Sequence, residues 1–454
     1  MNSRAFHYIP HTDADVRRML EVVDLPGIQA LFSTIPEKHR LERPLDLPAA
    51  ISEQELVREM STIAARNAHV ESHDWLLGAG TYAHYTPSAV DALVSRAEFT
   101  TSYTPYQAEI SQGTLQTIFE WQTMISSLTG VEVANASMYD GASATAEAAL
   151  MAMRVTRRSR VLVSAGLHPH YRAVLETYLD GLDSEIETLP LSPDGTTAPA
   201  DERLDDTVAC VVLQRPAFFG LVEPLAPFAE AAHAVGALLV ATTTEALSLA
   251  LLSSPGACGA DVVCGEAQSF GVPMGFGGPH LDFLATDKRR VRQMPGRLVG
   301  ETTDARGRRG YVLTLSTREQ HIRRERATSN ICTNQGLCLT MATVYLALLG
   351  RHGLRELALQ NLAKAEYARA RVRETPGLAL VFEAAGFNEF VVGVPDSAAA
   401  AQARALDADC VAGLDLASHA PQLGPALLLC TTEMTSRSAI DRCIDAIADR
   451  GGRT

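Results

Sequence analysis

Lysine is the scarcest charged residue of this 454-residue chain and occurs only at Lys38, Lys288 and Lys364. Chemistry that requires a lysine amine therefore has only three possible positions. An excess of basic residues is also lacking, because 53 acidic residues face 39 basic ones and leave a net charge of −14. Nucleic acids and anionic membranes select basic surfaces, so this balance argues against both as partners.

Cysteine pairs with the spacing of zinc ligands are absent. The eight cysteines are scattered between Cys210 and Cys443, and no two of them have the CxxC spacing. We therefore expect no metal site and no disulfide framework, but reduced thiols and a cytoplasmic location. The N-terminus shows no apolar core of a signal peptide. One long uncharged run, residues 331–350, contains several Thr, Asn and Gln side chains, which indicates a buried core helix rather than a membrane span.

Two capping patterns mark helix starts near the N-terminus. Thr12 with Asp15 and Ser52 with Glu55 have the spacing of capping boxes, and a Pro-rich stretch, residues 42–48, separates them. We therefore predict that residues 1–75 form a helical N-terminal extension that packs onto another surface.

The following part of the chain alternates between helical and strand-like stretches. A helix is predicted over residues 111–129, and an Ala-rich helix follows the turn at 139–143. Short apolar runs, each typical of a buried strand, then alternate with helical stretches; the runs are 161–164, 208–214, 237–243, 261–265 and 281–286, and the helices are 171–180 and 225–235. This alternation predicts βαβ units and a mainly parallel sheet covered by helices on both faces.

The last third of the sequence changes in character. It is rich in helical stretches and has few strands, such as residues 389–394, and the Ala run at 398–401 is predicted to be helical. The predicted organisation is thus the extension 1–75, a large α/β domain over 76–330 and a small α+β domain over 331–454.

In an open α/β sheet, ligands bind beyond the carboxyl ends of the strands, so the loops there are candidate sites. The turn before the Ala-rich helix could bind an anion at a helix start, or could simply be capped by Asp140 or Ser143. His168, just after a strand, could stack on an aromatic cofactor or move a proton, or could be a capping or core histidine.

Two further loops are candidates. The Gly-rich stretch 265–279 suits close approach of the backbone to a ligand or a partner, with a tight turn as the alternative. The Arg-rich stretch 318–330 suits carboxylates or phosphates, although Glu319 and Glu325 would also allow a salt-bridged surface helix.

Taken together, these regions resemble the fold-type-I pyridoxal-phosphate (PLP) enzymes. Four strings resemble more narrowly the P-protein family of the glycine cleavage system, and within it the alpha chain, subunit 1, of the two-subunit bacterial form. The strings are YTPYQAEISQGTLQ (103–116), ANASMYDGASATAEAALMA (134–152), RQMPGRLVGET (292–302) and REQHIRRERATSNICTNQ (318–335). The resemblance runs from about residue 8 to about residue 350 and weakens beyond.

The resemblance implies an α/β fold with a seven-stranded, mainly parallel sheet and an oxidoreductase reaction. Glycine is decarboxylated on PLP, its aminomethyl group passes to the lipoyl group of H-protein, and CO2 is released. It also implies a heterotetramer, α2β2, in which subunit 2 carries the PLP and its lysine.

The residues at the cofactor positions of this chain depart from a working PLP site. Gln268 stands where the Schiff-base lysine is expected, and Thr243 where a carboxylate would pair with the pyridine nitrogen. A glutamine amide cannot form an imine, so the chain alone is expected to be inactive. The resemblance makes the following residues a vestigial cofactor pocket: Gly141, Ala142, Ser143, His168, Thr243 and Gln268.

A second set of residues is expected to complete the partner's active site across the interface between subunits. It comprises Tyr103, Thr104, Tyr106, Gln107, Glu109, Gln112, Arg326, Thr328, Ser329 and Asn330. Two other functions stay open: a self-sufficient PLP enzyme that holds the cofactor non-covalently or through a displaced lysine, and a structural or regulatory pseudoenzyme with no role in the glycine reaction.

Overall fold

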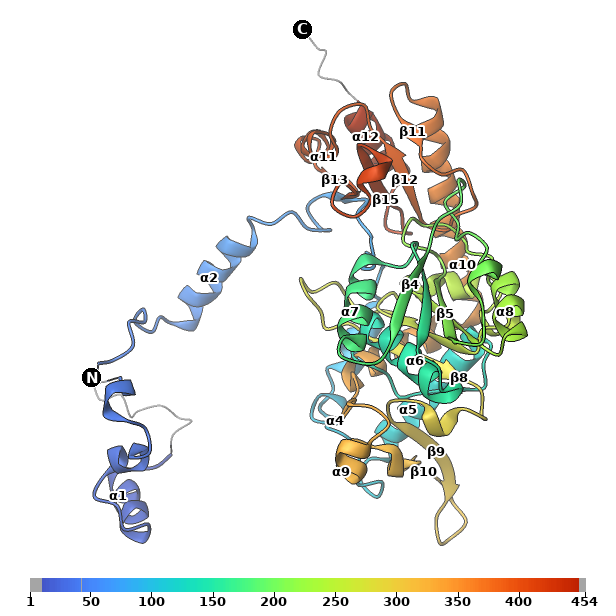
Figure 1. Cartoon of the computed structure of the whole chain (residues 1–454). Helices are drawn as coiled ribbons and strands as arrows, with labels where there is room; N and C mark the ends of the chain where they lie inside the picture. The colour runs from blue at the N-terminus through green and yellow to red at the C-terminus, as the bar shows by residue number, and fades with distance from the viewer. Residues whose placement is uncertain (1–9, 42, 449–454) are drawn as a thin grey trace. The chain divides into compact units, whose positions relative to one another are not determined.

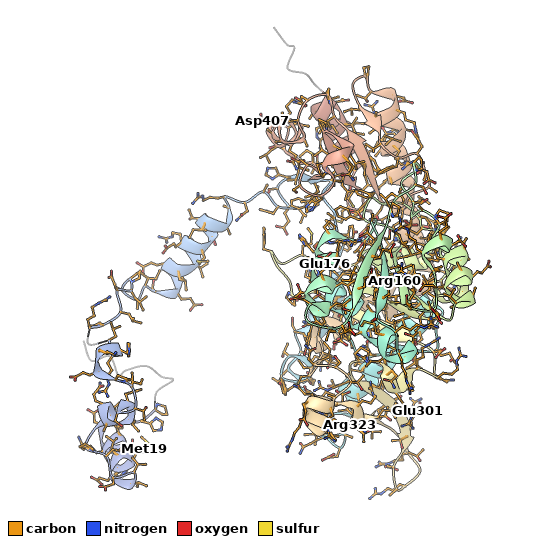
Figure 2. The ribbon with its side chains drawn as sticks, viewed as in Figure 1. Met19, Arg160, Glu176, Glu301, Arg323 and Asp407 are labelled. Atoms are coloured by element: carbon orange, nitrogen blue, oxygen red, sulfur yellow. The ribbon has the colours of Figure 1, made fainter. Side chains whose placement is uncertain are left out.

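The computed structural model describes residues 10–41 and 43–448, and the chain divides into two compact units, Met1–Asn67 and Ala68–Thr454. Helices α1 (Asp13–Val22) and α2 (Glu53–Ala64) belong to the first unit. Both begin with the predicted capping boxes, since the side chains of Thr12 and Ser52 accept hydrogen bonds from the third helical residue. Neither helix has a buried residue, and Figure 2 shows Met19 projecting from α1.

The second unit is built on a seven-stranded sheet with the order β2-β8-β7-β6-β5-β3-β4. The five strands from β4 to β7 in this order are parallel, while β8 runs antiparallel to β7 and β2 antiparallel to β8. This confirms the predicted, mainly parallel sheet. The strands are β2 (Val133–Ala134), β3 (Arg160–Ser164), β4 (Glu185–Leu189), β5 (Val208–Gln214), β6 (Leu238–Thr243), β7 (Val262–Glu266) and β8 (Asp282–Thr286).

Helices cover both faces of this sheet (Figure 1). Along β5, Val211 and Leu213 join one hydrophobic cluster, whereas Cys210 and Val212 join the other, because successive side chains of a strand point to opposite faces. Strands buried on both faces read as continuous apolar runs, which is why the sequence revealed them. The first cluster includes α5 (Gln112–Thr129), α8 (Leu225–Ala234) and part of α10 (Gly336–Glu374), and the second α6 (Gly141–Thr156) and α7 (Pro169–Leu179).

A smaller sheet with the order β11-β12-β15-β14 lies in the C-terminal part of the chain. It packs with α11 and α12 around a hydrophobic cluster of its own, and β1 pairs with β13 in parallel beside it. The separate domain predicted for 331–454 stays a prediction. The elements are β1 (Asp74–Trp75), β11 (Ala379–Leu380), β12 (Glu389–Gly393), α11 (Ala398–Asp407), β13 (Cys410–Val411), β14 (Leu414–Asp415), β15 (Ala426–Cys430) and α12 (Arg437–Ala448).

Helix α10 connects the two hydrophobic cores. Tyr345 on its first part is buried in the core of the large sheet, and Ala368 on its second part in that of the small sheet. Gly350, with φ 58° and ψ −173°, breaks the helix between them. By length and composition α10 could span a membrane, but 44% of its most apolar segment is buried inside the fold. The uncharged run therefore supplies core contacts, as predicted.

Five elements were not predicted or differ from the prediction. Strands β9 (Leu298–Thr303) and β10 (Arg309–Thr314) form an antiparallel hairpin that projects from the second unit in Figure 1. The Arg-rich stretch is helical only over α9 (Gln320–Arg323), flanked by short 3-10 turns. Short helices α3 (Ser88–Val94) and α4 (Ala97–Thr100) precede α5. In Figure 2, Glu301 on β9 and Arg323 on α9 lie at the same end of this unit.

Candidate functional site

The carboxyl ends of the parallel strands meet at one edge of the sheet, where the vestigial pocket was expected. Four side chains come from the ends of neighbouring strands or the loops after them: His168 after β3, Gln214 on β5, Thr243 on β6 and Gln268 after β7. All four are buried. The structure therefore brings the predicted residues His168, Thr243 and Gln268 to one place, together with Gln214, which the sequence did not single out.

Gln268 is fully engaged by neighbouring backbone. Its Nε2 donates to the carbonyl oxygens of Tyr82 (3.1 Å) and Val272 (2.7 Å), and its Oε1 accepts from the backbone N–H of Tyr82 (3.0 Å). Both amide hydrogens are thus used, and the side chain pairs with the Tyr82 residue in both directions. At the position expected for an imine-forming amine, the chain has an amide that holds another segment of the same chain.

His168 is likewise occupied. Its Nδ1 accepts from the backbone N–H of His170 (3.1 Å), so Nε2 carries the proton and donates to the carbonyl of Ala79 (3.0 Å). The ring lies against Tyr171 and Phe218, with centroids 5.2 and 5.0 Å away. Burial lowers its pKa to about 4, so the imidazole is neutral near pH 7. His168 therefore acts as a helix cap and a core side chain here, which is the alternative left open by the sequence.

The partner of both side chains is residues 79–84, which we call the plug segment. Its first residue, Ala79, adopts a left-handed conformation with φ 58°, and its backbone N–H donates to Oε1 of Glu389 (2.6 Å). The hydroxyl of Tyr82, which is fully buried, donates to Oε2 of the same carboxyl group (2.8 Å). Burial raises the pKa of Glu389 to about 7. The plug segment thus covers the end of the large sheet and is fastened to strand β12.

A buried ion cluster fixes the end of the plug segment. His84 lies between Glu245 (2.9 Å) and Glu433 (2.8 Å). Burial opposes the charge on His84, but the two carboxylates outweigh it and raise its pKa to about 10. Burial alone would also raise the pKa of Glu433, yet His84 and further hydrogen bonds lower it to about 2. His84 and Glu433 are therefore charged near pH 7, and the cluster links the segments that follow β6 and β15.

The three threonines at the end of β6 find partners within the fold. Thr242 contacts the hydroxyl of Thr145 (2.9 Å), Thr243 donates to the backbone carbonyl of Glu245 (3.3 Å), and Thr244 accepts from Gln214 (3.2 Å). No acid replaces Thr243, because the carboxylate of Glu245 is already bound to His84. Position 243 therefore offers a hydroxyl, and no carboxylate, to a pyridine nitrogen.

The start of α6, with Gly141, Ala142 and Ser143, is also capped internally. Asp140 accepts from the backbone N–H of Ser143 (2.8 Å), and Glu266 lies 3.4 Å from the N–H of Gly141. A third acid, Asp282, is completely buried nearby; burial, followed by Glu266 and Asp140, raises its pKa well above the usual range. The first N–H groups of this helix are thus already engaged by the side chains of Asp140 and Glu266.

Neither lysine of the second unit lies in this pocket. Lys38 belongs to the separate first unit, Lys288 is exposed and pairs with Glu132 (3.4 Å), and Lys364 donates to the backbone carbonyl of Glu433. Without an amine, a carboxylate for the pyridine or a free phosphate cradle, the residues of this chain do not fit PLP.

A cavity of about 710 Å³ opens beside the pocket. Asp140 and His280 line it together with Trp75 and the Gly-rich loop 274–279, whose Phe276 is exposed. The loop therefore borders an open space, and its backbone also turns sharply, with positive φ at Phe276, Gly277 and Gly278. Within the described part of the chain, no group of His, Cys, Asp and Glu side chains is placed to hold a metal.

The expected site-completing residues lie elsewhere on the second unit. The loop before α5 carries five of them: Tyr103, Thr104, Tyr106, Gln107 and Glu109. Thr104 is partly buried, and the other four are exposed. Gln112 at the start of α5 is held against the β9–β10 hairpin, because its amide exchanges hydrogen bonds with the backbone of Tyr311 (2.8 Å each).

The end of the Arg-rich stretch, residues 326–330, makes a different set of contacts. Ser329 donates to Glu147 on α6 (2.8 Å), and the backbone N–H of Thr328 donates to the carbonyl of Arg318 (3.1 Å). Arg326 is exposed, with Glu325 3.9 Å away, and Asn330 is exposed as well. Arg318, in contrast, is buried and donates to the carbonyls of residues 294 and 296. The Arg-rich stretch is thus neither one salt-bridged helix nor one cluster of free guanidinium groups.

Four residues that matter for these sites were not singled out from the sequence. They are Tyr82, His84, Glu389 and Arg297. The small-residue string GAGTYAHY at 78–85 was the available signal for the first two. Arg297 lies inside one of the strings that carry the family resemblance, but nothing in its spacing distinguished it from the other arginines.

Comparison with known proteins shows the family to which the chain belongs. The family model described as the glycine cleavage system P-protein matches residues 6–447. The chain belongs to this family. It is 54% identical over 432 residues to the probable glycine dehydrogenase (decarboxylating) subunit 1 of Anaeromyxobacter dehalogenans, covering 94% of this chain and 96% of that protein.

Solved structures agree with the family assignment. A crystal structure of glycine decarboxylase (P-protein) of the glycine cleavage system, in inhibitor-bound form, has a TM-score of 0.90 and 44% identity, covering 97% of this chain and 99% of that one. A C-DES mutant with glycine covalently linked to its PLP cofactor has a TM-score of 0.62 at 14% identity, covering 84% and 98%, and shows the fold alone. The fold-type-I architecture implied by the resemblance is confirmed.

Proposed function

We propose that this chain is the PLP-free subunit of a glycine dehydrogenase (decarboxylating), and that it works with a PLP-bearing subunit 2. Together they decarboxylate glycine, release CO2 and pass the aminomethyl group to the lipoyl group of H-protein. The reaction is supported by the P-protein family and by the relatives named as subunit 1 of this enzyme. The assignment of PLP to the partner subunit is supported by one observation: at the position expected for the lysine, the side-chain amide of Gln268 both donates to and accepts from the backbone of Tyr82.

The contribution of this chain is architectural. The plug segment engages Gln268 and His168, and the pocket has no amine for a cofactor, so the chain's own pocket would supply no step of the reaction. The exposed loop from Tyr103 to Gln112 and the segment from Arg326 to Asn330 are available to complete the partner's active site. Such elements would bind the substrate, exclude water from the reacting carbon and offer a surface to H-protein.

The proposed assembly is a cytoplasmic α2β2 heterotetramer. Fold-type-I sites form between subunits, and the name of the relatives implies a partner subunit. All eight cysteines are free thiols, which suits a reducing compartment. Neither nucleic acid nor membrane is a proposed partner, because the chain is acidic.

The test is co-purification of this chain with candidate subunit 2, followed by glycine–bicarbonate exchange. We expect exchange from the two chains together and none from this chain alone. Exchange by this chain alone would contradict the proposal and favour a self-sufficient PLP enzyme. Failure to bind either subunit 2 or H-protein would favour the pseudoenzyme without a role in the glycine reaction.

The site-completing role has its own test. Asn330→Ala and Arg326→Ala chains, each combined with subunit 2, should exchange glycine carboxyl carbon at least about tenfold more slowly, the typical loss for one positioned polar contact. Glu202→Ala, an exposed change in a 3-10 turn far along the chain, is the control. Full activity of both variants would show that this segment is not part of the active site.

A further inference from the structure

Arg297 is a buried guanidinium without a counter-charge. The residue precedes β9 and is 4% exposed. Its NH2 donates to the hydroxyl of Tyr106 (2.7 Å) and to the carbonyl of Cys332, while its NH1 donates to Thr104 Oγ1 (3.3 Å) and Asn334 Oδ1 (3.5 Å). All these acceptors are neutral, Nε has no partner, and no carboxylate of the described residues pairs with it. The ring of Tyr106 also lies 5.0 Å from the guanidinium carbon, so the charge of Arg297 is met by neutral groups alone, and an anion from outside the chain would supply the missing counter-charge.

A small cavity lies directly beyond two of these acceptors. It has a volume of about 140 Å³, room for several water molecules or a small oxyanion. No acidic or basic side chain lines it, although the chain carries 53 acids. One part of the wall is apolar, with Phe99, Ile118 and Leu337. The rest offers hydroxyl and amide groups without a carboxylate, which favours a negatively charged over a positively charged occupant; the polar side chains are those of Thr100, Ser102, Tyr103, Thr104, Thr114, Thr333, Asn334 and Thr340.

The start of α10 supplies a second source of positive potential. The helix begins at Gly336, and no side chain caps it. Its first N–H groups have no acceptor within the helix, and Gly336 and Leu337 both line the cavity. The aligned peptide dipoles place partial positive charge at this end. The helix start thus borders the cavity directly, whereas Arg297 contacts two of its lining residues, Thr104 and Asn334, from behind.

Thr104 connects the guanidinium to the cavity. Because its Oγ1 accepts from Arg297, its hydroxyl hydrogen is free to be donated into the cavity. A hydrogen bond received from a cation makes the hydroxyl a stronger donor. We propose that Arg297, Thr104, Asn334 and the first turn of α10 form a binding site for a small oxyanion, either a carboxylate or a phosphate group.

This inference deepens the proposed function and rests on it for the source of the anion. In the assembled enzyme, the carboxylate of the substrate and the phosphate of the cofactor held by the partner are both oxyanions of the kind that this site would bind. Arg297 is a positioning residue in this arrangement, since it acts through Thr104 and Asn334.

The site itself is tested on the isolated full chain with inorganic phosphate as the probe, by titration calorimetry. Thr104→Val removes the donor and keeps the shape, so phosphate should bind about tenfold more weakly, as expected for a lost hydrogen bond to an anion. Thr117→Val is the matched control, because this hydroxyl on α5 donates to the carbonyl of Gly113 (3.0 Å), away from the cavity. Equal phosphate affinity in both variants, or no binding by the unmodified chain, would overturn the proposal.

The charge is tested separately. Arg297→Lys should retain phosphate binding within about tenfold, whereas Arg297→Met should abolish it, with circular dichroism to verify folding. A purely structural role predicts instead that both changes disturb folding alike and that Lys does not rescue binding. If Arg297→Met does not fold, the Thr104→Val result decides.

The source is tested in the complex with subunit 2. If the anion is the substrate carboxylate, Thr104→Val raises KM for glycine about tenfold and leaves PLP retention unchanged; if it is the cofactor phosphate, PLP retention falls and KM holds at saturating PLP. If both KM for glycine and PLP retention stay unchanged in Thr104→Val, the assignment of this site to the glycine reaction is overturned. Phosphate binding by the isolated chain is measured without turnover, so that result stands even if the proposed function fails.

Discussion

Replacing Gln268 by Met tests the self-filled pocket, because Met keeps the volume of the side chain and removes its polar atoms. Three hydrogen bonds are lost, two to Tyr82 and one to Val272. Gln268 is 2% exposed, so water cannot replace them. Each unsatisfied buried group costs about 1–3 kcal/mol, and we expect a total loss of about 3–5 kcal/mol in the free energy of unfolding. That is a large share of the roughly 5–15 kcal/mol of a typical domain.

The assay is urea denaturation followed by circular dichroism at neutral pH, with Gln116→Met as the control. Gln116 lies on an exposed face of α5 and contacts only Glu120, so its replacement should change stability by at most about 0.5 kcal/mol. A loss below about 1 kcal/mol for Gln268→Met would show that the plug segment is not held by this amide, and would refute the reasoning.

Two further predictions concern the same edge of the sheet. The folded pKa of His84, about 10, lies above its ordinary value of 6.5, so its contribution to stability is present below pH 6.5 and lost as the pH rises through about 10. His84→Asn should therefore flatten the fall of the unfolding free energy over this range in urea titrations; an equally steep fall in the variant would contradict this. Gly265→Ala should cost at least about 2 kcal/mol, because φ is +147° and a Cβ would lie 2.1 Å from the carbonyl oxygen of Thr243. Gly113→Ala, in open space on α5, should instead stabilise the chain by about 0.5–1 kcal/mol, and similar thermal shifts for both variants would count against the packing described here.

The fold could be predicted from the sequence where local patterns decide it. The fully buried strands β5 to β8 appear as apolar runs, and the capping boxes at Thr12 and Ser52 mark their helices. The β9–β10 hairpin could not be recognised, because its exposed half is rich in Thr and Arg and lacks an apolar alternation.

The site could be predicted only in part, for a physical reason. Position 268 was identified by its order before the Gly-rich loop, but its partner Tyr82 is 186 residues away and follows no local rule. Capping of α6 by Asp140 was one of the two alternatives left open by the sequence, but the additional contact with Glu266 comes from strand β7, 125 residues away. Contacts of this kind depend on the folded arrangement and have no signature in the sequence.

The central claim is that this chain's own pocket cannot hold the cofactor. The most direct measurement is to incubate the isolated chain with excess PLP, reduce it with borohydride, remove free PLP and examine it by mass spectrometry and visible absorbance, with the reconstituted complex treated in parallel. We predict that the complex carries the modification on its partner subunit and that no peptide of this chain containing Lys38, Lys288 or Lys364 is specifically modified. Stoichiometric modification of any one of these lysines would contradict the account.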